Sequence, residues 1–345
     1  MTSGNGDGKF PVEAFSARTL PPDVRPYYPP LPEPRRTRSL IIAAALFGLT
    51  VLSTLVAGTQ FALDYARNRP SSLDTFFGAY SAIWREPRLL LAGLPFSFTL
   101  IGILLAHELG HYFACRYYGI PASYPYFIPA PTLIGTLGAF IRIRAPIINR
   151  KALFDVGLAG PVVGFLFAVP ALAIAIAYSK IIPGAENSAP LVFGNPLLSR
   201  MLLALLQPGV SSADLLLHPV GRAAWVGLFA TALNLLPAGQ LDGGHILYAL
   251  ASEQHRRVSL AVATILVLIG GPAMLYAMGV AMPKVFGQLW PGWVFWGVLL
   301  LLLRFRHPPL LNRWEPIDRK RIVWAAVALL IFLLCFMPAP FTFND

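Results

Sequence analysis

Charged residues are scarce in this sequence. Asp, Glu, Lys and Arg together make up 12% of the 345 residues, against about 25% in a typical soluble domain. Hydrophobic residues make up 56%, and they gather into runs that are long enough to cross about 30 Å of hydrocarbon. The composition therefore excludes an ordinary soluble domain and predicts a polytopic membrane protein, with the lipid bilayer around it.

Cysteine and acidic residues are also few. Cys115 and Cys335 lie far apart in the sequence and match neither a disulfide framework nor a cysteine metal site, so we expect both to be buried apolar side chains. The 16 acidic residues are outnumbered by 27 basic ones, which gives a net charge of +11. Because the basic residues alternate with apolar runs, they indicate membrane orientation and no nucleic-acid partner.

The apolar runs predict an all-α polytopic membrane protein with about six to seven transmembrane helices. They cover residues 40–63, 89–112, 153–178, 223–237, 258–280, 293–303 and 322–337. If the N-terminus lies inside, 19 of the 27 basic residues lie on the inner side, as the positive-inside rule requires. An eighth apolar piece, residues 196–206, is too short to span and is expected to be interfacial or re-entrant.

The second run ends in a metal-binding pattern, His107-Glu108-Leu109-Gly110-His111. In a helix, residues four apart lie on one face, so His107 and His111 project together and can share one metal ion, usually zinc. Glu108 lies beside that ion and can act as a general base towards water. Ionisable residues at membrane depth are costly, which makes these three residues candidates for function.

A segment rich in proline follows, from residue 119 to residue 151. Its prolines exclude a continuous helix, and residues 135–144 alternate in a way that predicts a short re-entrant strand or hairpin near the site. Two interpretations stay open. The strand can be a structural loop, or it can offer an edge to which an unwound substrate adds as a further strand.

A third metal ligand is needed, because a catalytic zinc site has three protein ligands and one open position. Asp242 is the best candidate, since Pro237, Gly239 and Gly243 break the fourth apolar run beside it. Asp155, near the start of the third run, is interpreted as a helix cap or a local ion-pair partner. His245 is either a neighbour of the metal ligands or an ordinary residue at a helix start.

Taken together, these patterns resemble the site-2 protease family of intramembrane zinc metalloproteases. The resemblance rests on His107-Glu-Leu-Gly-His111, on Ala159-Gly-Pro161 and on Asn234-x-x-Pro237-x-x-x-x-Asp242-Gly243, and it covers roughly residues 89–250. It implies one Zn²⁺ per chain, held by His107, His111 and Asp242. It also implies that Glu108 is the catalytic glutamate and that Asn234 helps to orient or stabilise the reacting carbonyl.

The function expected from the resemblance is hydrolysis of membrane-anchored proteins within or near their transmembrane segment. Two alternatives are kept: a membrane transporter of metal ions, and a homologue that binds membrane helices without cleaving them. The expected location is a bacterial cytoplasmic membrane, with the site towards the cytoplasm. The oligomeric state is left open.

Four segments are expected along the chain. Residues 1–38 form a proline-rich, disordered cytoplasmic tail, and residues 39–88 hold the first transmembrane helix and a connection. Residues 89–250 form the catalytic membrane core, and residues 251–345 carry the C-terminal transmembrane helices.

Overall fold

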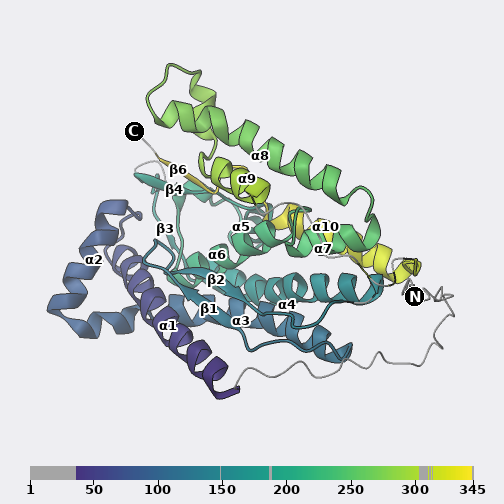
Figure 1. Ribbon diagram of the computed structural model, residues 1–345. Helices are drawn as coiled ribbons and strands as arrows, with labels where there is room; N and C mark the ends of the chain where they lie inside the picture. Colours follow the sequence, from purple (N-terminus) through teal and green to yellow (C-terminus); the bar gives the residue numbers. More distant parts are fainter. Residues whose placement is uncertain are drawn as a thin grey trace, which may run out of the picture.

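The computed structural model describes residues 36–147, 149–185, 189–302, 310, 312 and 314–343. The expected tail therefore lies almost wholly outside the described residues. The described part is mostly helical, with a few short strands (Figure 1).

Ten α-helices are assigned in the described part of the chain. Their bounds are α1 Arg36–Ala66, α2 Leu73–Arg85, α3 Leu94–Tyr117, α4 Arg150–Ala177, α5 Leu197–Leu206, α6 Pro219–Asn234, α7 Asp242–Leu250, α8 His255–Ala277, α9 Gly292–Leu302 and α10 Arg319–Cys335. A 3₁₀ helix at Pro87–Gly93 leads directly into α3.

Four of these helices are long and apolar enough to cross a membrane: residues 38–66, 87–117, 150–177 and 255–277. The chain is thus a membrane protein with four candidate spans among the described residues. The other helices expected to span are shorter, with 16 residues in α6, 11 in α9 and 17 in α10. The total of six to seven spans stays a prediction.

The strands form three antiparallel pairs: β1 Tyr126–Pro129 with β2 Thr136–Phe140, β3 Lys180–Ile181 with β5 Leu215–Leu216, and β4 Leu191–Phe193 with β6 Phe341–Phe343. The first pair falls in the segment where the sequence predicts a strand. β2 is shorter than the predicted residues 135–144, and the extended chain after it is held by single bonds to residues 121–123. The other two pairs are too short to be predicted from the sequence pattern.

Helices α3, α4 and α6 make the centre of the molecule, with α1 on one side and α8 and α9 on the other (Figure 1). Phe96 and Leu100 of α3, Phe154 of α4 and Leu228 of α6 are fully buried there. Both cysteines are buried, as expected. By contrast, α1 leaves many apolar side chains exposed, as a helix that faces lipid does.

Candidate metal centre

Helix α3 presents two histidines and a glutamate at the centre of the molecule. His107 and His111 lie one turn apart, and their Nε2 atoms are 3.1 Å from each other. Glu108 follows His107 directly, so its side chain points about 100° further around the helix. All three are buried, with exposed fractions of 6%, 5% and 8% for His107, Glu108 and His111.

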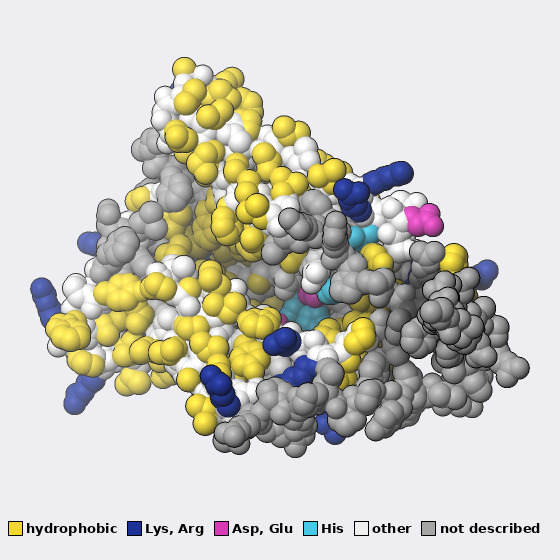
Figure 2. Space-filling view, viewed as in Figure 1, with side chains coloured by type: hydrophobic (Ala, Val, Ile, Leu, Met, Phe, Trp, Pro, Cys, Tyr) yellow, Lys and Arg dark blue, Asp and Glu magenta, His cyan; other side chains and the backbone are white. Residues whose placement is uncertain are grey.

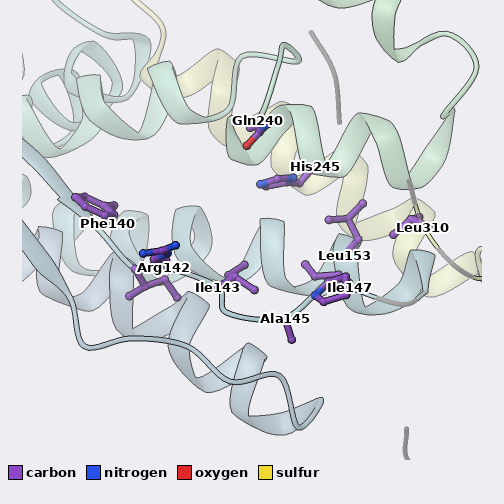
Figure 3. Close-up of a pocket in the computed structure, with 11 residues that line it drawn as sticks. Phe140, Arg142, Ile143, Ala145, Ile147, Leu153, Gln240, His245 and Leu310 are labelled. Atoms are coloured by element: carbon purple, nitrogen blue, oxygen red, sulfur yellow. The ribbon is translucent and has the colours of Figure 1, made fainter. Parts of the chain in front are cut away.

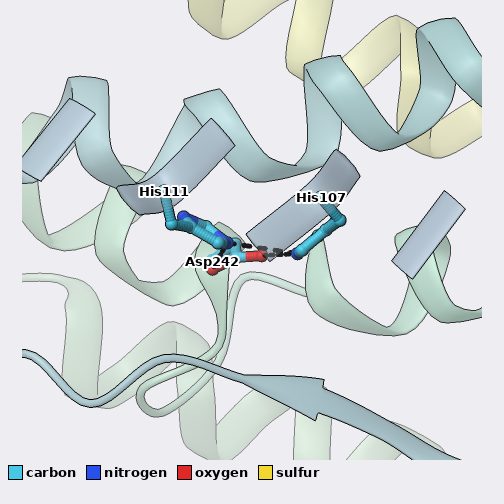
Figure 4. Close-up of side chains that lie close together, drawn as sticks. All are labelled: His107, His111 and Asp242. Carbon is cyan, nitrogen blue, oxygen red and sulfur yellow. Dashed lines mark hydrogen bonds and ion pairs between the residues drawn. The ribbon is translucent and has the colours of Figure 1, made fainter. Parts of the chain in front are cut away.

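Asp242 is brought to the two histidines by a break between α6 and α7. Its Oδ2 lies 3.2 Å from His107 Nε2 and its Oδ1 lies 3.3 Å from His111 Nε2 (Figure 4). Gly239 turns the chain with a φ of +59°, a conformation that favours glycine. At Gly243 a Cβ would lie 2.1 Å from the carbonyl oxygen of Leu235. The sequence prediction of a broken helix beside Asp242 is confirmed.

Helix α4 packs against the histidines through glycines. A Cβ at Gly160 would lie 2.1 Å from His111 Nε2, and one at Gly164 would lie 3.1 Å from His107 Nδ1. Gly160 and Gly164 form a G-x-x-x-G pattern, which lets helices approach closely, and what these glycines touch is the candidate ligands themselves. Pro161 neither ends the helix nor separates it into two, since α4 runs from Arg150 to Ala177.

The protonation of the centre follows from its hydrogen bonds. His111 Nδ1 lies 2.7 Å from the carbonyl oxygen of Val156, which can only accept, so Nδ1 carries the proton and Nε2 of the neutral ring carries a lone pair. That lone pair faces a second imidazole nitrogen and a carboxylate. Asp242 Oδ2 is buried and has no hydrogen-bond partner among the described residues. Electron-rich atoms that converge in this way repel one another unless a cation lies between them.

The donor set also has the right size for zinc. Ligand atoms about 2.05 Å from a tetrahedral zinc ion are separated by about 3.3 Å. Here the two histidine Nε2 atoms are 3.1 Å apart, while Asp242 faces the two rings with different oxygens, Oδ2 at 3.2 Å from His107 Nε2 and Oδ1 at 3.3 Å from His111 Nε2. The described part of the chain contains one such group of three or more possible metal ligands.

Asn234 and Glu108 flank the three converging side chains. Asn234 is the last residue of α6, and its Nδ2 lies 3.3 Å from His107 Nε2. The Glu108 carboxylate is faced by the backbone N–H of Ile141, just after β2. The sequence indicates both Asn234 and Glu108 as candidate site residues, but nothing in its pattern indicates that Ile141 contacts Glu108.

A cavity of about 420 Å³ lies between the chain after β2 and the start of α7 (Figure 3). Its lining is largely apolar and includes Phe140, Ile143 and Leu153, with Arg142, Gln240 and His245 as polar groups. In the space-filling view, histidine and acidic side chains are seen at the bottom of a hollow, with basic side chains along its lower edge (Figure 2). His245 thus lies in the first turn of α7 and lines this cavity.

The remaining ionisable candidates have structural partners. Asp155 does not cap α4, because Asn149 does. Instead, Asp155 Oδ1 accepts from Arg321 Nε at 2.9 Å, and Asp155 also accepts from the Tyr118 hydroxyl. Asp155 is therefore an ion-pair partner, but its partner Arg321 is 166 residues away in the sequence and not local. Burial and the bond to Asp155 raise the pKa of Tyr118, which keeps this hydroxyl a donor.

The remaining histidines lie outside the candidate centre. His218 caps α6, and His255 lies within 3.0 Å of the Gly239 carbonyl oxygen. His307 falls outside the described residues.

Comparison with known families gives a match to peptidase family M50 over residues 95–278. This range holds α3, α4, α6 and α7, and with them every residue of the candidate centre. The chain belongs to peptidase family M50. The resemblance to site-2 proteases predicted from the sequence is confirmed.

Similar curated proteins are plant metalloproteases. The chain is 29% identical over 323 residues to "Probable zinc metalloprotease EGY1, chloroplastic" of Arabidopsis thaliana, covering 89% of this chain and 54% of that protein. It is 32% identical over 227 residues to the rice protein of the same name, covering 63% of this chain and 38% of that protein. The chain thus spans about half or less of the length of these relatives. Their names refer to chloroplasts and lend no support to a bacterial cytoplasmic membrane.

Proposed function

We propose that the chain is an intramembrane zinc metalloprotease that hydrolyses peptide bonds of membrane-anchored proteins within or near their transmembrane segment. The observation that carries this proposal is the convergence of two histidine nitrogens and the Asp242 carboxylate, whose nearest atoms are 3.1 to 3.3 Å apart, with Glu108 next along the same helix. Membership of peptidase family M50 supports it.

In this proposal His107, His111 and Asp242 hold one Zn²⁺. Zinc, when bound, supplies Lewis acidity that polarises a carbonyl and makes water a stronger acid. Val156 fixes the His111 tautomer through its carbonyl oxygen, so that Nε2 is free to bind the metal. The geometry of the three ligands is held by α4, whose glycines leave space for the two rings.

Glu108 takes the proton of the attacking water and then gives a proton to the leaving amine. Its burial keeps bulk water from competing for this exchange. Asn234 carries amide donors at the edge of the centre, where they can stabilise the negative charge that develops on the substrate carbonyl oxygen. One donor in such a position contributes about 3 to 4 kcal/mol to transition-state stabilisation.

The substrate helix must unwind before cleavage, because a helix shields its peptide bonds. Unwound backbone in lipid has to be hydrogen-bonded by protein. The chain after β2 offers such partners: Ser123 donates to Arg142 and Arg144 donates to Pro121, so the N–H and C=O of Ile143 point to the opposite edge. A substrate strand added at this edge would lie along the cavity beside Glu108.

The site lies on the side of the membrane that carries most of the basic residues. This is the side on which α1 begins and α3 ends, and it faces the cytoplasm in the predicted orientation. The proposed segments are those expected from the sequence: a tail at residues 1–38, a first helix and connection at 39–88, the catalytic core at 89–250 and C-terminal helices at 251–345.

A metal-ion transporter is less well supported, since a transport path does not need a glutamate beside the first ligand.

The test is cleavage of a panel of single-span membrane proteins by the purified full chain in liposomes. Glu108→Gln keeps the size of the side chain and removes the base, so we expect cleavage to fall about 10² to 10⁴-fold. Glu253→Gln, at an exposed glutamate outside the centre, is the matched control and should leave cleavage unchanged. Undiminished cleavage by Glu108→Gln would reject Glu108 as the base.

A further inference from the structure

A second, polar pocket lies away from the metal centre, between the start of α1, the end of α3 and the chain around β1 and β2. It has a volume of about 190 Å³, compared with roughly 30 Å³ for one water molecule in the liquid. We call it the Arg144 pocket. Its polar side chains are Ser39, Tyr112, Ser123, Tyr124 and Arg144.

The charge of this pocket is unbalanced. Arg144 is partly buried, and in the described part of the chain its guanidinium has no ion pair or hydrogen bond. A guanidinium carries five N–H donors, which are costly to leave unpaired away from water. The residues that line the pocket include no Asp or Glu. The pocket therefore offers an unpaired positive charge to an anion.

Hydroxyl groups surround the same space. Tyr112 and Tyr124 line it, and their hydroxyls form no hydrogen bond to other described residues. Ser39 Oγ lies 2.5 Å from the Tyr126 hydroxyl, which fixes the first turn of α1 against β1. The Ser123 hydroxyl donates to the Tyr124 carbonyl oxygen. The Arg144 guanidinium and the hydroxyls of Tyr112 and Tyr124 remain as a donor set that suits the oxygens of a phosphate group.

The position of the pocket favours a lipid headgroup as the source of such a phosphate. It lies where the first turn of α1 meets the last turns of α3, and both helices are long and apolar enough to cross a membrane. Tyrosines gather at that depth because their rings face lipid and their hydroxyls face the headgroups. Next to the pocket, Leu40 and Ile41 of α1 are 51% and 62% exposed, and they offer an apolar surface for acyl chains.

We propose that the Arg144 pocket binds the phosphate of an anionic phospholipid headgroup, and that the bound lipid fastens α1 to the β1–β2 pair. This site takes no part in the hydrolysis proposed above and can be tested without a substrate. The bound lipid would stabilise the wall of the cavity beside the metal centre, because Arg144 lies two residues after Arg142, which lines that cavity.

The experiment measures lipid binding to the purified full chain in neutral detergent, by native mass spectrometry and by the shift in melting temperature. The probes are phosphatidylglycerol, phosphatidylcholine and inorganic phosphate. We expect phosphatidylglycerol to bind best, and Arg144→Gln to weaken its binding about tenfold, the usual effect of losing one charge-assisted hydrogen bond. Tyr112→Phe should weaken it severalfold.

The matched control is Arg116→Gln, which removes an exposed positive charge from the last turn of α3. It should leave the affinity for phosphatidylglycerol within the error of the wild type. Equal effects of Arg144→Gln and Arg116→Gln would overturn the proposal, because they would show diffuse attraction to the surface. Stabilisation by inorganic phosphate that equals that by the lipid would also overturn it, in favour of a site for a free anion.

Discussion

Gly160 is the position where a single added methyl group should disturb the metal centre most. In Gly160→Ala the new Cβ would lie 2.1 Å from His111 Nε2 and 2.5 Å from both ring carbons beside it, whereas ordinary contact begins at 3.4 Å. The imidazole would have to move by roughly 1 Å to relieve the overlap. It is not free to do so, because its Nδ1 is bound to the Val156 carbonyl oxygen at 2.7 Å.

A displacement of this size is large compared with what zinc ligation tolerates. Ligand distances in zinc sites vary by about 0.2 Å, so His111 should no longer bind the metal in Gly160→Ala. Substitutions that merely disturb the surroundings of a ligand lower metal affinity about 10 to 100-fold. We expect a loss at least at the upper end of that range, although no ligand has been changed.

The assay is competition for zinc with a chromophoric chelator, with circular dichroism to confirm that the helices are intact. Gly102→Ala is the matched control, because Gly102 is also a helical glycine and no atom lies within 4 Å of its hypothetical Cβ. That variant should bind zinc normally and gain about 0.5 to 1 kcal/mol in stability. Zinc affinity in Gly160→Ala equal to that of Gly102→Ala would refute the packing argument.

Two other substitutions separate the parts of the proposed mechanism. Ile143→Pro removes the N–H that points to the open edge, so we expect cleavage of membrane substrates to fall about tenfold while zinc content is unchanged. Ile143→Ala keeps the N–H and should cleave nearly normally; equal activities of the two would exclude strand addition at this edge. Asn234→Ala should keep one zinc per chain and lower kcat about 10² to 10³-fold, and a loss of zinc would show that Asn234 supports the ligands.

The grouping of the candidate metal ligands could be largely predicted from the sequence because its signals are local. His107 and His111 lie on one face of their helix wherever that helix is placed in the fold. Pro237 and Gly239 predict the broken helix beside Asp242. Bringing Asp242 to the histidines depends on packing across more than 130 residues, and there the sequence supplied a candidate that the structure places within 3.3 Å.

Contacts between helices could not be predicted in the same way. The G-x-x-x-G of α4 indicated a close approach to another helix, but the partner depends on how α3 and α4 are rotated against each other. For the same reason the sequence could not show that Gly160 touches His111, or that Asp155 pairs with Arg321, 166 residues away. Length and hydropathy alone do not decide whether the shorter helices α9 and α10 cross the membrane, so they do not fix the number of spans.

The central claim is that one zinc ion joins α3 to α7. The most direct measurement is the zinc content of the purified full chain, for the wild type, Glu108→Gln, His111→Ala and Asp242→Ala. We expect about one zinc per chain in the first two and almost none in the other two, because a catalytic zinc site depends on all three ligands. A wild type without zinc, or zinc retained after Asp242→Ala, would contradict the account.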